Sequence, residues 1–169
     1  MTLSIPRPAL VLMMGVAGSG KSTFARDRFR PTEVVSSDAC RALVADDEKD
    51  QTATKAAFEV LHLIVAQRLA AGKLTVVDAT NVQAWARTSL LKLAREANVP
   101  AVAIVLNLPE SVAAAQNASR LDRVVDSEAI RQQNLDLQAS LLELPGEGFA
   151  AVYILASRDD LTHTSLDIS

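Results

Sequence analysis

The sequence has one cysteine, few aromatic residues and no long apolar run, and each shortage excludes a class of protein. A single cysteine, Cys40, cannot build an internal disulfide framework, which is typical of a reducing compartment. No apolar stretch approaches the roughly 18 residues that a membrane-spanning helix needs, and the N-terminus lacks a signal-peptide pattern. The net charge of −3 argues against a broadly basic nucleic-acid surface. We therefore expect a cytoplasmic protein without a membrane partner, in which any anion binds at a small local site.

The order of apolar segments predicts an α/β fold. A chain of 169 residues is about one domain, and apolar runs without alternation are typical of parallel strands that are covered on both faces. Such runs occur at 9–14, 33–36, 74–78, 100–107 and 150–155. Helical spacing fills the intervals at 21–30, 57–71, 85–94, 111–119 and 127–144, the third of these indicated by Trp85, Leu90, Leu91, Leu93 and Ala94. The pattern predicts three layers around a five-stranded parallel sheet, followed by a polar tail at 158–169 that shows no pattern.

Residues 15–22 read GVAGSGKS and match the phosphate-loop pattern G-x-x-x-x-G-K-[ST] in full. Glycines allow backbone angles at which successive N–H groups point at phosphate oxygens. Lys21 would reach the β- and γ-phosphates, and the Ser22 hydroxyl would hold Mg²⁺. The sequence therefore predicts a site for ATP or another nucleoside triphosphate. The phosphate-binding residues expected there are Gly15, Gly18, Ser19, Gly20, Lys21, Ser22 and Thr23.

A carboxylate at the predicted acceptor side indicates a small phosphotransferase. The D-x-x-G and N-K-x-D strings of a GTPase do not occur. Asp38 follows the second predicted strand, at the edge of the sheet where ligands bind. It would either take the proton of an attacking hydroxyl as general base or merely cap the next helix. Arg41, one turn later, would orient that carboxylate, grip an anionic substrate or form a surface pair.

Two further groups of residues leave their function open. Arg120, Arg123 and Arg131 belong to a cluster that would either stabilise charge on the γ-phosphate or form a solvated salt-bridge face with neighbouring acids. Asp78, at the end of the third predicted strand, would support Mg²⁺ or bind Ser22, or would be a plain strand-end cap. The residues alone do not decide between these alternatives.

Several of these strings together resemble one family, the 5′-OH polynucleotide kinase domain of bacterial polynucleotide kinase–phosphatase, an RNA end-healing and sealing enzyme. The blocks GVAGSGKSTFA, PTEVVSSDACR, GKLTVVDATN and NASRLDRVV carry the resemblance, which covers nearly the whole chain. It implies a P-loop kinase fold with a helical lid at about residues 116–131. It also implies ATP-dependent phosphorylation of the 5′-hydroxyl end of RNA or DNA with Mg²⁺.

The resemblance also implies roles for single residues. Lys21 and Ser22 would bind phosphate and metal, and Asp38 would be the general base. Arg41 would contact the nucleic acid, whereas the catalytic Arg120 and Arg123 of the lid would cover the ATP phosphates. The lid of the family often begins with an arginine where this chain has Gln116, so that arginine's role is not carried over. Full-length proteins of the family carry phosphatase and adenylyltransferase modules after the kinase, so we expect residues 1–169 to be one domain of a longer protein.

Two other functions share these features. A P-loop kinase for a small-molecule hydroxyl, such as that of a sugar, nucleoside or antibiotic, would use the same loop, base and lid. A nucleotide-binding module that regulates a partner would need the loop and not Asp38. With an aromatic content of 4%, the chain has little to stack on bases, so we expect contacts to nucleic acid to be mainly with the backbone.

Overall fold

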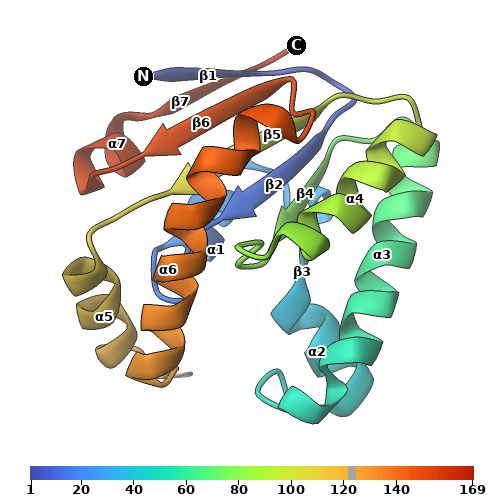
Figure 1. Ribbon diagram of the computed structural model, residues 1–169. Helices are drawn as coiled ribbons and strands as arrows, with labels where there is room; N and C mark the ends of the chain where they lie inside the picture. The colour runs from blue at the N-terminus through green and yellow to red at the C-terminus, as the bar shows by residue number, and fades with distance from the viewer. Residues whose placement is uncertain (122–124) are drawn as a thin grey trace.

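A computed structural model describes residues 1–121 and 125–169 of the chain. Its centre is a five-stranded parallel sheet with strand order β3-β4-β2-β5-β6 (Figure 1). The strands are β2 (Leu10–Met14), β3 (Val34–Ser36), β4 (Thr75–Asp78), β5 (Ala101–Leu106) and β6 (Ala151–Leu155). All neighbouring strands pair in parallel. The predicted α/β fold with five parallel strands is confirmed.

The strands β2 and β5 are apolar throughout because both faces of the sheet are covered. Val11 and Met13 of β2 point into one apolar cluster, whereas Leu10 and Leu12 point into a second on the opposite face. Every residue of β2 and β5 is buried. Alternating side chains of a strand lie on opposite faces, so a strand between two helical layers needs apolar residues at every position.

Helices form the two outer layers. The helix α1 (Lys21–Arg28) packs on one face through Phe24 and Ala25. The other face is covered by α3 (Thr54–Ala70) and α4 (Ala84–Glu96) and, nearer β5, by α6 (Ser127–Glu143). The helix α2 (Ser37–Ala45) packs against α3, and α5 (Glu110–Ala118) against α6, so that the two pairs stand apart at one edge of the sheet (Figure 1). Within the two described ranges, no helix is long and apolar enough to cross a bilayer. Short 3₁₀ turns occur at η1 (Pro31–Glu33), η2 (Gln51–Ala53) and η3 (Leu144–Gly146).

The C-terminal tail is ordered, and its description as patternless is wrong. It forms α7 (Arg158–His163) and β7 (Ser165–Ile168), and β7 pairs in parallel with β1 (Thr2–Ile5) as a separate two-stranded sheet near both termini (Figure 1). Leu166 and Ile168 pack on the cluster that holds the fully buried Leu3 and Ile5. The alternation of apolar and polar residues at 165–168 is a strand signal, but a run of four residues is too short to be read without its distant partner.

Candidate active site

A cleft of about 920 Å³ lies at the carboxyl edge of the sheet, where ligands bind in this architecture. This volume is near the top of the range for a ligand pocket, so it has room for a nucleotide together with part of an acceptor. The phosphate loop, the start of α2, the loop after β4 and the end of α5 line it. Of the residues predicted from sequence, the lining contains Gly18, Gly20, Lys21, Ser22, Thr23, Asp38, Arg41 and Arg120. Gly15 and Ser19 also belong to the loop but are buried and are not part of the cleft lining. Arg123 lies outside the described residues.

The shape of the phosphate loop requires its glycines. Gly18 has a φ of +81°, and a Cβ added there would lie 2.8 Å from the carbonyl oxygen of Ala113 in α5. Gly15 has a φ of +149°, and its added Cβ would lie 2.9 Å from the carbonyl oxygen of Leu106. A side chain at either position would meet backbone as well as strained dihedral angles. The loop therefore lies in direct contact with β5 and α5.

Residues from other elements hold the loop from behind. The Gly15 N–H donates to the carbonyl of Thr80 at 3.0 Å, and the Asn81 side-chain amide donates to the carbonyl of Met13 at 2.7 Å. From α6, the Gln133 side chain accepts a hydrogen bond from the Ala17 N–H at 2.8 Å. Thr80 and Asn81 follow β4 at the edge of the sheet, where substrate contacts are also expected, and in these two hydrogen bonds they fix the loop. The link from Gln133 was not predicted, because only the packing of α6 brings it to the loop.

The Lys21 side chain is buried and lies across its own loop. Its exposed fraction is 7%, and Nζ donates to the carbonyl of Val16 at 2.8 Å. Burial of an ammonium group is unfavourable unless oxygen atoms surround it, and the loop supplies such atoms here. The charge therefore lies where the loop N–H groups and the start of α1 also favour an anion.

The acceptor side of the cleft contains Asp38, which is not the cap of α2. Ser36 is the N-cap of that helix, and its hydroxyl accepts from the Ala39 N–H at 3.3 Å. The capping alternative for Asp38 is therefore wrong. Asp38 lies in the first turn, its side chain 34% exposed, and lines the same cleft as Lys21.

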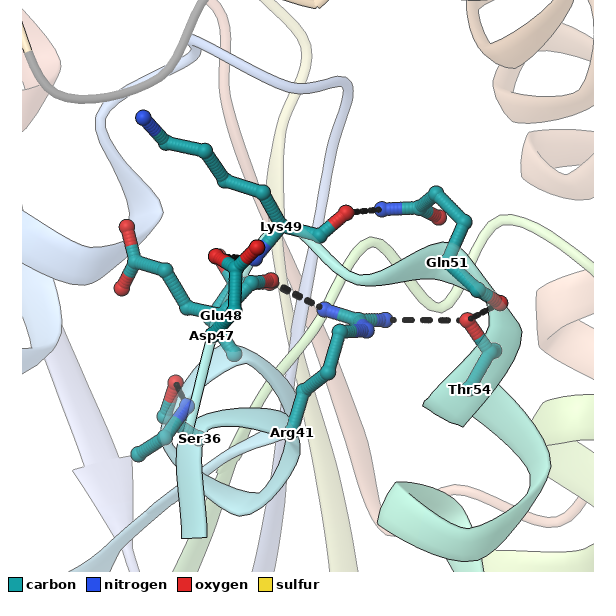
Figure 2. Close-up of polar contacts among 9 residues, drawn as sticks. Ser36, Arg41, Asp47, Glu48, Lys49, Gln51 and Thr54 are labelled. Carbon is teal, nitrogen blue, oxygen red and sulfur yellow. Dashed lines mark hydrogen bonds and ion pairs between the residues drawn. The ribbon is translucent and has the colours of Figure 1, made fainter. Parts of the chain in front are cut away.

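Arg41 orients the Asp38 carboxylate from a buried position. Its Nη1 atom lies 2.7 Å from Asp38 Oδ1, and the residue is only 5% exposed, so the surface-pair alternative is wrong. Figure 2 shows the same guanidinium donating to the carbonyl of Glu48 at 3.2 Å and to the hydroxyl of Thr54 at 3.5 Å. The Nε–H of Arg41 has no hydrogen-bond partner among the described residues. The loop after α2 and the start of α3 thus fix a guanidinium that holds one oxygen of the carboxylate.

Of the two arginines predicted for the lid, Arg120 lines the cleft. It lies two residues after α5, and Gln116 of α5 lines the cleft with it. The side chain of Asn117 donates to the Val125 carbonyl at 2.7 Å and accepts from the Val125 N–H at 2.9 Å, so it links the end of α5 to the residues before α6. Arg131 is exposed on α6 and is not part of the cleft lining.

Sequence reasoning overlooked two residues of α4. Arg87 is fully buried and bonds to Glu147, Ser140 and the carbonyl of Asn81, which ties α4 to α6 beside the cleft. The sequence did hold a signal for Arg87: it lies three positions before the apolar Leu90, so the two residues share one face of the helix. Trp85 does not join the apolar face of α4 as its spacing indicated; it is 67% exposed and lines the cleft.

The cleft offers ligands that suit Mg²⁺. Ser22 is exposed at the start of α1, and Asp78, 7% exposed at the end of β4, lines the same cleft. Mg²⁺ is usually held by one or two such oxygen ligands together with waters and substrate phosphates. The donor set therefore fits this ion. In the described parts of the chain, no group of three or more His, Cys, Asp or Glu residues could hold a metal ion without other ligands.

Comparisons with known proteins identify the type of fold. The sequence profile of a family described as "AAA domain" matches residues 10–145. No curated protein sequence matches the chain. The solved structures that match include a chain of the Pnkp1/Rnl/Hen1 RNA repair complex, with a TM-score of 0.68 and 22% identity over 80% of this chain. The match covers 46% of that longer chain.

Small-molecule kinases are also similar to this chain. A gluconokinase from Sinorhizobium meliloti 1021 has a TM-score of 0.55 and 19% identity, covering 93% of this chain and 87% of its own. The Mycobacterium tuberculosis APS kinase, solved with AMPPNP and APS, has a TM-score of 0.57 and 16% identity, covering 92% of each chain. At these identities the similarity concerns the fold, which is that of P-loop kinases.

Proposed function

The chain belongs to the AAA domain family and has the fold of a P-loop kinase, and from this premise we propose that it is an ATP-dependent polynucleotide 5′-hydroxyl kinase. The enzyme would transfer the γ-phosphate of ATP, or of another nucleoside triphosphate, to the 5′-OH end of RNA or DNA during end repair.

The observation that carries the proposal is the pairing of Asp38 with Arg41 in the same cleft as the phosphate loop. Arg41 holds one carboxylate oxygen at 2.7 Å from its Nη1 atom, and the carboxylate remains one-third exposed. A general base must be fixed and yet reachable by the hydroxyl from which it takes a proton. A regulatory nucleotide-binding module would not need a carboxylate that an arginine fixes in the same cleft as the phosphate loop.

Four charged groups of the cleft, Lys21, Asp38, Asp78 and Arg120, then have a defined task in the transfer. The 5′-hydroxyl oxygen forms a bond to the γ-phosphorus while the bond from that phosphorus to the β,γ-bridging oxygen breaks, and ADP leaves. Asp38 takes the hydroxyl proton. Lys21 and Arg120 stabilise the negative charge of the transferred group. Mg²⁺, when bound by Ser22 and supported by Asp78, would neutralise part of the phosphate charge.

The choice of a polynucleotide as acceptor is supported by two findings. The resemblance of the Asp38–Arg41 and lid blocks is to polynucleotide kinases, and one similar structure comes from an RNA repair complex. Since a gluconokinase and an APS kinase share the fold, a kinase for a small-molecule hydroxyl is the competing function. The acceptor must therefore be tested directly.

The decisive experiment is transfer of label from γ-labelled ATP with Mg²⁺. We would offer a short 5′-OH RNA and DNA, the same strands with a 5′-phosphate, and a panel of small alcohols. Label should enter only the 5′-OH strands. Asp38→Asn should lower the rate by about 10²- to 10⁴-fold, the usual contribution of a general base, and should leave ATP binding intact. Asp47→Asn, in the exposed loop after α2, is the matched control and should keep full activity.

Three results would contradict the proposal in different ways. Label in a small alcohol and in no strand would establish the competing kinase. Full activity of Asp38→Asn would assign the base to another residue. ATP binding without transfer to any acceptor would favour a regulatory nucleotide-binding module.

A further inference from the structure

The tryptophan of the chain lines the cleft. Trp85 is the one tryptophan in the sequence, and it belongs to the first turn of α4, the helix that follows β4 in the chain. The neighbouring strand of the sheet on the side away from β2 is β3, and the helix that follows β3 carries Asp38. Trp85 and Asp38 both line the cleft.

The exposure of Trp85 is not explained by the packing of its helix. The side chain is 67% exposed, whereas the next residues Ala86 and Arg87 are buried against the protein. An indole that becomes covered removes roughly 150–250 Å² from water, and the fold leaves most of this surface open. A flat ligand that covers the ring in the cleft would gain that burial.

Other groups that line the cleft suit a planar heteroaromatic ring. Phe58 of α3 lines it, and it has an edge contact with His62 at a centroid distance of 6.4 Å. Gln51 and Gln83 line the cleft as well; the Gln51 amide donates to the carbonyl of Lys49 and the Gln83 amide to Asp136, so a base would meet the remaining N–H and carbonyl groups of these amides. Aromatic faces provide stacking and amides provide hydrogen bonds to the edge of a base. An aliphatic polyol would use the amides but gain little from two aromatic rings.

We propose that Trp85 is the stacking platform for the nucleobase of the terminal nucleotide that presents its 5′-hydroxyl to Asp38. The inference rests on the proposed function and adds a base contact to it. It changes the expectation of mainly backbone contacts, because the low aromatic content matters less when the tryptophan lies in the cleft. Every base has a π-face, so stacking still predicts little preference among the four bases.

Fluorescence gives a direct reading, because Trp85 is the single tryptophan. We would saturate the wild-type protein with AMPPNP and Mg²⁺ and titrate a 5′-OH oligonucleotide. A base stacked on the indole should quench its emission. The same strand with an abasic 5′-terminal residue should bind more weakly and leave the emission almost unchanged.

Kinetics of two variants provide the second reading. Trp85→Ala should raise the KM for the oligonucleotide by about 5- to 160-fold, the range that stacking on one aromatic residue provides, while the KM for ATP stays unchanged. Trp85→Phe should recover much of the loss. Leu63→Ala removes an equally exposed apolar side chain (61%) of α3 outside the cleft lining, so it is the control and should match the wild type. The variants should keep the melting temperature, because both side chains are exposed.

Failure of the inference and failure of the proposed function give different results. If wild-type protein labels the 5′-OH strand, but Trp85→Ala keeps its KM and the abasic strand quenches equally, the stacking role is overturned and the kinase function remains. If the wild-type protein labels no strand, the polynucleotide function fails and the base platform is rejected with it.

Discussion

Replacing Arg87 with methionine should lower the free energy of unfolding by about 3 kcal/mol. The Arg87 side chain is fully buried, and its Nε donates to Glu147 Oε2 at 2.8 Å while Nη2 bonds to Oε1 of the same carboxylate. Its Nη1 donates to Ser140 Oγ at 2.8 Å and to the carbonyl of Asn81 at 3.1 Å. Methionine would fill the space of the aliphatic stem but would leave these oxygen atoms without their donor.

The magnitude follows from what remains after the substitution. Removing one partner of a buried ion pair usually costs about 3–5 kcal/mol, because the other charge is left uncompensated. The side chain of Glu147 is 17% exposed and that of Glu143, 3.5 Å from Arg87, is 57% exposed, so water can solvate both carboxylates. The effect therefore belongs at the lower end of the range. It is still a large part of the roughly 5–15 kcal/mol that keeps a domain folded.

Urea denaturation is the assay, read as a shift of the midpoint at constant slope. Glu147→Gln and the double variant complete a cycle, in which the two changes together should cost less than their sum by about 0.5–3 kcal/mol. Lys92→Ala breaks an exposed pair on the same helix, with exposures of 69% and 60%, and should change stability by less than about 0.5 kcal/mol. A loss for Arg87→Met as small as that of Lys92→Ala would refute the reasoning.

The remaining predictions concern the phosphate loop and pH. Gly18→Ala should lower AMPPNP affinity at least about five-fold in calorimetry, because strained backbone of this kind costs on the order of 1–3 kcal/mol and the added Cβ meets α5. Gly72→Ala is the control, since Gly72 has a φ of +68° but nothing within 4 Å of an added Cβ, and it should keep wild-type affinity. Equal AMPPNP affinities of the Gly18→Ala and Gly72→Ala variants would refute the steric argument. Burial lowers the pKa of His62, so the folded protein favours the neutral imidazole. The neutral imidazole therefore contributes its full stability above the unfolded-state pKa of about 6.5. This contribution is lost as pH falls through the lower pKa of the folded state. Denaturation at several pH values should show this slope in the wild type and a shallower slope in His62→Gln; identical slopes would contradict the assignment.

Local signals of the sequence were enough to predict the sheet and the nucleotide side of the cleft. The strands beginning at Leu10 and Ala101 are continuous apolar runs, since helices cover both their faces. The phosphate loop follows one such run directly, so its residues are ordered by neighbours in the chain. The order of parallel strands then places Asp38 at the edge of the sheet where the loop also ends.

Contacts between residues far apart in the chain could not be predicted in this way. Gln133 reaches the Ala17 N–H only because α6 packs beside β5. The strands β1 and β7 are both four residues long, and each becomes a strand by pairing with the other end of the chain. Such pairings depend on the closure of long loops, about which a short sequence window holds no information.

The phosphate loop between a buried strand and a helix was predictable from the sequence, because the residues that define that loop are contiguous. The tertiary structure was needed to place the other groups of the cleft. It buries Arg41 and thereby makes it the support of Asp38, and it turns Trp85 out of the apolar face of α4 into the cleft. The physical reason is that burial and orientation depend on which elements pack together, whereas helical spacing fixes only the relative directions of side chains within one helix.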